Sequence, residues 1–403
     1  MQWPKVKLDI VKADMRYAFV GGPFGSNLTT RDYVDEGVPV IRGNNLPADR
    51  IFLDDDFVFV TEEKADTLQS NIAYPGDVIF TQRGTLGQVG IIPLEAKFPR
   101  YVISQSQMKL SVNPEKIEAR FVYYFFRMSS TVQSVINHAL TSGVPHINLG
   151  ILKDFEIPLP HIAVQGRIVD ILSAYDDLIE NNQRRMGLLE ETTRQLYREW
   201  FVRLRFPGHE HTRITHGVPE GWERKTLGYL ADITMGQSPE SQYYNQAGEG
   251  LPFHQGVTDF GDRFVNHRIF CTVQNRVAEA GDILCSVRAP VGRLNITLDK
   301  IVIGRGLAAL RSKRGNQSLL FQQLRAHFFK EDLIGVGAIF ASVTKKEFEA
   351  QEILNPPTRL ANSFEEVSRP IDEQLRALSQ QNQKLRAARD ILLPRLMSGE
   401  IAV

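Results

Sequence analysis

Residues 168–200 read IVDILSAYDDLIENNQRRMGLLEETTRQLYREW, and this stretch decides how the rest of the chain is organised. Its apolar residues recur at the spacing of one helix face, which predicts a single long helix. Two rows with a step of seven residues form a coiled-coil seam: Ile168, Tyr175, Asn182, Leu189 and Leu196, and Leu172, Ile179, Met186, Thr193 and Trp200. Asn182 lies mid-seam, where a polar residue sets the register or the partner at a cost in stability.

A second helix near the C-terminus carries a matching seam. Its rows are Ile371, Leu378, Leu385 and Leu392, and Leu375, Asn382, Arg389 and Leu396. We predict an antiparallel coiled coil with Asn182 opposite Asn382, in which the numbers of paired residues add up to 564. The resulting layers are Leu189–Leu375, Met186–Leu378, Ile179–Leu385, Leu172–Leu392 and Trp200–Phe364, with two imperfect ones, Tyr175–Arg389 and Leu196–Ser368. The alternative is two unrelated surface helices, each packed on its own domain.

Composition limits the class of protein only loosely. The chain has 403 residues, which favours two or three domains, and its 47 basic and 47 acidic residues give no net charge. A local basic patch for nucleic acid is compatible with this neutral total. We expect a cytoplasmic protein without a membrane span, because there is no signal-peptide core, no apolar run of about 18 residues and only two cysteines, Cys271 and Cys285.

The order of motifs along the chain predicts an α+β protein with two tandem mixed domains, each followed by a long helix. The predicted parts are a first domain (1–160), a first helix (161–206), a polar linker (207–221), a second domain (222–358) and a second helix with a tail (359–403). In the first domain the segments 38–43, 76–82 and 101–110 are β-like, and 119–138 is helical. Pro394 is expected to end the second helix near Leu393.

The two halves are copies of each other. PGDVIFTQRGTLGQVGI (75–91) aligns without gaps on AGDILCSVRAPVGRLNI (280–296). Gly76, Asp77, Arg83 and Gly87 thereby fall on Gly281, Asp282, Arg288 and Gly292, each pair 205 positions apart. The helices repeat as well, because Asn182-Gln183 matches Asn382-Gln383 at a separation of 200. A period this long indicates duplicated domains and excludes a solenoid, whose units are far shorter.

Catalytic motifs are weak or absent. The sequence has no phosphate-binding GxxxxGK[ST], no GxGxxG after a strand and no HExxH, so we expect no catalysis. Asn355-Pro356-Pro357-Thr358 lacks the aromatic residue of adenine-methylating enzymes and is interpreted as a loop. No metal site is predicted, since His209, His211 and His216 fit a solvated linker.

The duplicated loop is more informative, because Arg83 and Arg288 each follow a strand on a turn. Such a turn can present a guanidinium and backbone N–H groups to a phosphate, although an arginine that ties the loop to its own domain explains the pattern equally well. Polar residues nearby could contact base edges, since arginine pairs with guanine and asparagine or glutamine with adenine. These candidates are Arg42, Asn44, Asn45, Gln82 and Gln88 in the first copy, and His254, Gln255, Arg293 and Arg305 in the second.

These strings resemble the specificity subunit of type I restriction–modification systems. GDVIFTQRGTLGQ (76–88) and INLGILKDFEIPLP (147–160) resemble a target recognition domain, and residues 171–201 and LLPRLMSGEI (392–401) resemble the family's spacer regions. In the second domain GAIFASVTKKEF (337–348) is a looser version of SGVPHINLGILKDF (142–155).

The resemblance implies a non-catalytic adaptor that reads double-stranded DNA. Each domain would read one half of an asymmetric, bipartite site, and the helices would set the distance between the halves. Two methylase subunits would bring S-adenosylmethionine, and restriction subunits would cut the DNA. The 33 residues from Ile168 to Trp200 span about 48 Å of helix, or about one and a half turns of duplex. The competing interpretations are a stand-alone DNA-modifying enzyme and a coiled-coil scaffold.

Overall fold

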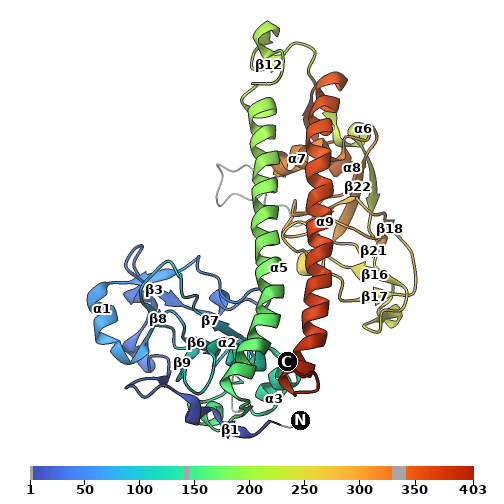
Figure 1. Ribbon diagram of the computed structural model, residues 1–403. Coiled ribbons are helices and arrows are strands. Elements are labelled where there is room, and N and C mark those ends of the chain that lie inside the picture. The colour runs from blue at the N-terminus through green and yellow to red at the C-terminus, as the bar shows by residue number, and fades with distance from the viewer. Residues whose placement is uncertain (1–2, 140–144, 329–341) are drawn as a thin grey trace. The chain divides into compact units, whose positions relative to one another are not determined.

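The computed structural model describes residues 3–139, 145–328 and 342–403. It divides into two compact units, Met1–Asn181 with Asn382–Val403, and Asn182–Gln381. Each unit combines short strands with helices. The two long helices, α5 (Ile162–Tyr197, green in Figure 1) and α9 (Thr358–Met397, red), each contribute one part to each unit.

The first unit is built on two four-stranded sheets. One sheet has the order β2-β9-β6-β7 and is antiparallel throughout, with β2 (Phe19–Gly21), β9 (Gln107–Leu110), β6 (Val78–Thr81) and β7 (Val89–Ile91). The other has the order β4-β3-β8-β5, with β4 (Val58–Val60), β3 (Val38–Ile41), β8 (Tyr101–Ile103) and β5 (Ile72–Ala73). In the second sheet β3 and β8 run parallel. These strands confirm the β-structure predicted in segments 38–43, 76–82 and 101–110.

The central strand β6 is buried on both faces, which explains its uninterrupted apolar sequence. Val78 and Phe80 pack in one cluster with Phe121 of α2 (Ala119–Arg127), whereas Ile79 packs with Ile41 in a second cluster. This alternation is the two-residue period of a strand. Figure 1 shows α2 against β6 and β7, while α1 (Glu62–Thr67), α3 (Ser129–Asn137), α4 (Leu149–Lys153) and the pair β1 (Lys5–Lys7) and β10 (Glu156–Pro158) complete the unit.

The second unit repeats this topology and adds one strand to the mixed sheet. Its antiparallel sheet β14-β22-β19-β20 has β14 (Ala231–Met235), β22 (Leu307–Ser312), β19 (Ile283–Ser286) and β20 (Leu294–Ile296). Its other sheet, β15-β17-β16-β21-β18, has β15 (Tyr244–Asn245), β17 (Phe270–Cys271), β16 (Leu251–His254), β21 (Ile301–Ile303) and β18 (Val277–Ala278). The parallel pair β16 and β21 corresponds to β3 and β8. The unit also contains α6 (Leu227–Leu230), α7 (Gln317–Phe328), α8 (Lys345–Glu349) and the pair β13 (Glu223–Thr226) and β23 (Glu352–Asn355).

One local prediction is wrong. The second helix continues through Pro394 to Met397, because Leu393, Leu396 and Met397 are buried in the core of the first unit and hold the last turn in place. The segment predicted as a linker contains a small hairpin of β11 (Ile214–Thr215) and β12 (Val218–Pro219). Of the motif 337–348, residues 337–341 lie outside the described residues, as do residues 142–144 of its counterpart.

Within the first unit, a buried charge pair joins the two long helices. Arg389 of α9 bonds the carboxylate of Asp176 of α5, and Tyr124 of α2 donates its hydroxyl to the same carboxylate at 2.7 Å. Burial works against the charged form of Arg389, but attraction to Asp176 outweighs it and raises the pKa of the guanidinium above its usual value. One carboxylate thus ties α9 and α2 to α5.

Within the second unit, the contacts between α5 and α9 follow opposite orders along the two helices. Asn182 donates to Gln381 at 3.3 Å near one end, and near the other the ring of Trp200, in the π-helical turn Arg198–Val202 that continues α5, lies 5.9 Å from the ring of Phe364. Between them, the buried Arg263 contacts Asp372 of α9 and lies 3.9 Å from Glu190 of α5. This arginine joins the strand-bearing part of the second unit to both helices.

A matched capping contact ties each long helix to its own domain. Gln165 of α5 accepts a hydrogen bond from the backbone N–H of Glu118, the residue that precedes α2, at 3.0 Å. Glu365 of α9, 200 positions later, accepts from the backbone N–H groups of Ser318 and Leu319 in the first turn of α7, at 3.1 and 3.2 Å. Such contacts satisfy N–H groups that a helix leaves unpaired at its start.

None of the helices within the described ranges combines the length and apolar content that crossing a bilayer demands. No three His, Cys, Asp or Glu side chains among the same residues gather in a way that could hold a metal ion.

The buried pair makes a prediction about stability. Asp176→Ala should lower the free energy of unfolding by about 3–5 kcal/mol, because it removes the main partner of a buried guanidinium and of the Tyr124 hydroxyl. Urea denaturation is the measurement. Asp177→Ala, at the exposed neighbouring position, is the matched control and should change stability by less than about 0.5 kcal/mol. Equal effects of the two substitutions would contradict the assignment.

Candidate nucleic-acid interface

Strand directions in the first unit bring four connecting segments to one edge. β6 ends at Thr81, which pairs with Gln107 at the start of β9, and β2 ends at Gly21 beside the same strand end. The parallel strands β3 and β8 both end here, with Ile41 in register with Ile103. The segments that follow β2, β3, β6 and β8 therefore meet, and we call this the reading edge of the first unit.

Backbone hydrogen bonds hold these segments together. The N–H of Gln82 donates to Ser106 at 2.7 Å, and the N–H of Gly22 donates to Gln107 at 2.8 Å. The N–H of Ile147 donates to Gln82 at 3.1 Å, which brings in the segment that precedes α4. The reading edge is thus a bonded framework of loops, and five of the predicted residues lie on it: Arg42, Asn44, Asn45, Gln82 and Arg83, with Gln88 at the other end of the β6–β7 turn.

Arg83 is presented to solvent by this framework. It is exposed, and its side chain makes no hydrogen bond or ion pair among residues 3–139, 145–328 and 342–403. Gly87 closes the turn at φ +84, and a Cβ there would meet Val132 at 2.8 Å, so only glycine fits. The side chain of Arg83 therefore does not tie the loop to its own domain within the described residues, which was the alternative interpretation.

Arg288 repeats this arrangement in the second unit. It is exposed, its side chain makes no hydrogen bond or ion pair within the described ranges, and it is followed by Gly292 at φ +87. The backbone of Arg83 forms an isolated antiparallel β-bridge with His146, and that of Arg288 forms one with Ser342. The turn in each copy is therefore fixed by the segment that precedes a short helix, α4 in the first unit and α8 in the second. The repeated arginines therefore occupy equivalent turns.

The base-reading candidates of the first unit divide into two groups. Asn45 is fully buried; its amide donates to the carbonyls of Leu53 and Asp55 at 3.1 and 2.9 Å, so it shapes the loop and does not face a base. Asn44 is exposed and donates to Asp56 at 2.9 Å, and half-buried Arg42 donates to the carbonyl of the same residue at 3.3 Å.

The two glutamines lie deeper on the turn. Gln82 and Gln88 are both half-buried, and Gln88 accepts from the hydroxyl of Thr81 at 3.2 Å. With Arg42 and Asn44, they remain able to reach a ligand placed on the reading edge.

In the second unit, His254 does not lie where it could contact a base, contrary to the prediction from the sequence. It is fully buried and bonded to His267 at 2.9 Å, which in turn bonds Asp299 at 3.0 Å. Burial, reinforced by His267, lowers the pKa of His254 to about 4, so it is neutral at pH 7 and belongs to the interior. Gln255, Arg293 and Arg305 are exposed, and Gln255 accepts from the hydroxyl of Ser238 at 2.8 Å.

The aspartates of the repeated Gly-Asp pair are structural. Asp77 accepts from the buried ammonium of Lys109 at 3.2 Å, and Asp282 accepts from Arg311 at 2.7 Å. Burial raises the pKa of Asp282, and Arg311 opposes that rise. The pair fixes the start of the central strand in each unit.

Two residues of this region were not predicted from the sequence. Ser238 joins Gln255 to the backbone of Arg305, and Phe24 stands on the reading edge with its side chain in solvent. Phe24 could have been found from its setting, because an aromatic residue between Pro23 and Gly25 in a turn has little chance of burial. Nothing in the sequence around Ser238 distinguishes it from an ordinary loop serine.

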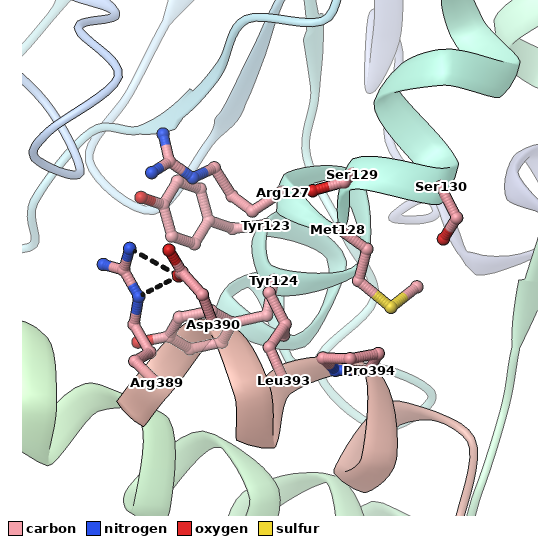
Figure 2. Close-up of a pocket in the computed structure, with 10 residues that line it drawn as sticks. All are labelled: Tyr123, Tyr124, Arg127, Met128, Ser129, Ser130, Arg389, Asp390, Leu393 and Pro394. Carbon is pink, nitrogen blue, oxygen red and sulfur yellow. Dashed lines mark hydrogen bonds and ion pairs between the residues drawn. The ribbon is translucent and has the colours of Figure 1, made fainter. Parts of the chain in front are cut away.

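A separate cavity of about 290 Å³ lies beside the helices of the first unit (Figure 2). It is lined by Tyr123, Tyr124, Arg127, Met128, Ser129, Ser130, Arg389, Asp390, Leu393 and Pro394. The guanidinium of Arg389 is occupied by Asp390 at 2.8 and 3.0 Å, and burial raises the pKa of Tyr123 to about 12. No activated nucleophile is built into this lining.

Comparison with known proteins places the chain in a family. Residues 25–191 and 219–360 match the family described as the type I restriction modification DNA specificity domain. A specificity subunit ascribed to the type I restriction enzyme MjaX of Methanocaldococcus jannaschii is 28% identical over 388 residues, covering 94% of this chain and 91% of that protein. The MjaIX specificity subunit of the same organism is 24% identical over 360 residues and covers 85% and 82%.

A solved structure shares the fold. The type I restriction–modification system S subunit from M. genitalium superposes with a TM-score of 0.59 at 16% identity, covering 98% of this chain and 96% of that one. Since the family match takes in both units and most of the chain, the protein belongs to the type I restriction modification DNA specificity domain family, the non-catalytic recognition subunits of type I systems.

Proposed function

We propose that each unit reads one half of an asymmetric, bipartite DNA site and thereby directs adenine methylation and DNA cleavage by partner subunits in the cytoplasm. The observation that carries this proposal is the pair of equivalent turns that present Arg83 and Arg288. Two phosphate-binding turns of the same design suit two half-sites on one duplex, because phosphates are alike at every sequence. S-adenosylmethionine would be held by a partner methylase, two copies of which would join the restriction subunits.

The long helices would act as the spacer between the half-sites by pairing as an antiparallel coiled coil. The contacts in each unit support this arrangement: Asn382 donates to the carbonyl of Ile179 at 3.4 Å in the first unit, and Asn182 donates to Gln381 in the second. A polar residue at a seam restricts the registers that the helices can adopt. Fixed helices would give a fixed gap in the DNA site.

A scaffold protein and a stand-alone modifying enzyme make different predictions. A scaffold has no need for two exposed arginines at matched turns, and an enzyme would modify DNA without a partner. Gel retardation of duplex DNA, with and without the methylase subunit, separates the three. We expect DNA retardation that depends on the sequence of the duplex, and methylation of that DNA only when the methylase subunit is present. No retardation in either condition would exclude the proposal.

Arg83→Ala and Arg288→Ala should each weaken binding to all DNA sequences alike. Each removes one phosphate contact, so the slope of log K against log salt should fall by about 0.9. Fluorescence anisotropy over a salt series is the measurement. Arg120→Ala is the control, since Arg120 is exposed in the first turn of α2, away from the reading edge. A changed methylation motif at unchanged affinity would show that these arginines read bases.

Exchange of residues 1–155 for the matching domain of a relative should change one half of the methylated motif and leave the other half and the gap unchanged. Base readout must lie where the copies differ, because a contact common to two unlike half-sites cannot distinguish them. The donor domain should supply a tyrosine at the place of Tyr124, so that Asp176 keeps its partner. Methylation mapping is the measurement, and a change in the gap or in both halves would disprove the modular reading.

Asn182→Leu combined with Asn382→Leu should raise the free energy of unfolding by on the order of 1 kcal/mol, because an apolar pair replaces a buried polar one. The two helices should at the same time become less restricted to a single register against each other. Thermal unfolding reports the first effect, and the gap length in the methylated motif reports the second. A loss of stability would count against a shared layer for the two asparagines.

A further inference from the structure

Among the described residues of the first unit, Phe24 has the most exposed large apolar side chain. Its side chain is 89% exposed, and its ring lies in no aromatic or cation–π pair within the described ranges. It follows β2, which ends beside Gln107, and it therefore belongs to the reading edge that carries Arg83. All the other phenylalanines within the described ranges are buried or half-buried, so the exposure of this ring is unusual for the protein.

The loop that carries Phe24 is held in place from both sides. Gln105 donates its amide to the carbonyls of Gly25 and Leu28, at 2.5 and 2.7 Å, and Leu28 is buried in a core cluster. A Cβ on Gly22 would lie 2.0 Å from the carbonyl oxygen of Ser104, so the strand end packs tightly against the neighbouring turn. Phe24 is thus presented on a fixed loop, so a ligand that contacts it would lose little affinity to the entropy cost of ordering the loop.

The second unit has a polar residue at the same place. The N–H of Gly22 donates to Gln107 and that of Gly236 to Leu307, which aligns the two strand ends. Two residues further on, Phe24 corresponds to Ser238, whose hydroxyl is engaged with Gln255 and with the backbone of Arg305. The exposed ring is therefore a feature of the first reading edge alone, at a position where the copies must differ to read unlike half-sites.

We infer that Phe24 packs against the bases of the first half-site and contributes to its selection, an inference that rests on the proposed function. Apolar side chains contact bases on the methyl group of thymine or at an opened base step, and both contacts depend on the sequence. The neighbouring Arg83 supplies the phosphate contact that would bring the ring to the groove. Bases supply the apolar surface that Phe24 lacks within its own unit.

Phe24→Ala tests the inference in the complete complex with the methylase, on the duplex that it methylates. We expect a loss of affinity of roughly ten- to a hundred-fold, the range that removal of an aromatic–base contact gives. The salt slope should stay unchanged because no charge is removed, which distinguishes this loss from that of Arg83→Ala. Leu94→Ala is the matched control: Leu94 is 82% exposed and follows the end of β7 at the opposite edge of the same sheet.

Further arms locate the contact. Phe24→Trp should keep most of the affinity and gain a fluorescence change on addition of DNA, measured against the wild-type tryptophan signal. Deoxyuridine in place of each thymine of the half-site tests the methyl group. If deoxyuridine lowers the affinity of the wild-type complex but not that of Phe24→Ala, the ring contacts a thymine methyl; if it lowers neither, the ring contacts a base step.

Wild-type affinity for Phe24→Ala, or an equal loss of affinity for Leu94→Ala, would overturn the inference. If wild-type protein binds no DNA, the proposed function fails instead.

Discussion

The structure depends on how each long helix is fixed to its own recognition domain. In both units a side chain of the helix satisfies the first N–H groups of a domain helix, with Gln165 at α2 and Glu365 at α7. These residues are 200 positions apart, the same period as the two asparagines of the seam. The contact fixes the register of the helix against its own domain, because a slip of one residue would leave these N–H groups unpaired.

The same contact has different chemistry in the two copies. Gln165 is neutral and also donates to the carbonyls of Lys116 and Pro160 at 3.1 and 2.8 Å. Glu365 only accepts, and burial raises its pKa although the N–H and hydroxyl donors of α7 oppose that rise. A carboxylate at a helix start also gains from the helix dipole. The duplication therefore retained the position and the geometry of the contact while the side chain changed.

A second difference separates the copies along the helix pair. The predicted layer of Tyr175 and Arg389 corresponds, after a shift of 200, to Leu375 and Leu189, which share an apolar cluster in the second unit. In the first unit the charge of Arg389 is taken by Asp176, the residue next to Tyr175. Because a buried charge tolerates few alternative partners, this layer penalises any pairing that puts Arg389 opposite an apolar residue. The parts of α5 and α9 in the first unit therefore pack with different chemistry from those in the second unit.

Prediction from sequence succeeded where periodicity and repetition carry the signal. The tandem α+β domains, the strands at 38–43 and 76–82 and the long helices follow from patterns that burial imposes on sequence. It failed for single polar residues, because Asn45 and His254 have the composition of surface residues and are buried by loops that fold back over them. It failed at Pro394 because three buried neighbours outweigh the loss of one backbone hydrogen bond.

The polar residues of each unit fall into two groups, a structural framework and a proposed reading surface. The framework consists of Asp77 and Lys109, their counterparts Asp282 and Arg311, and the capping contacts, all of which hold strand and helix ends by paired polar groups. The proposed reading surface consists of side chains that the framework leaves in solvent, and apart from the equivalent Arg83 and Arg288 these differ between the copies. A substitution on the surface leaves every framework bond in place. New recognition can therefore arise on this fold without a compensating change in the core, provided that the turn glycines keep their backbone conformation.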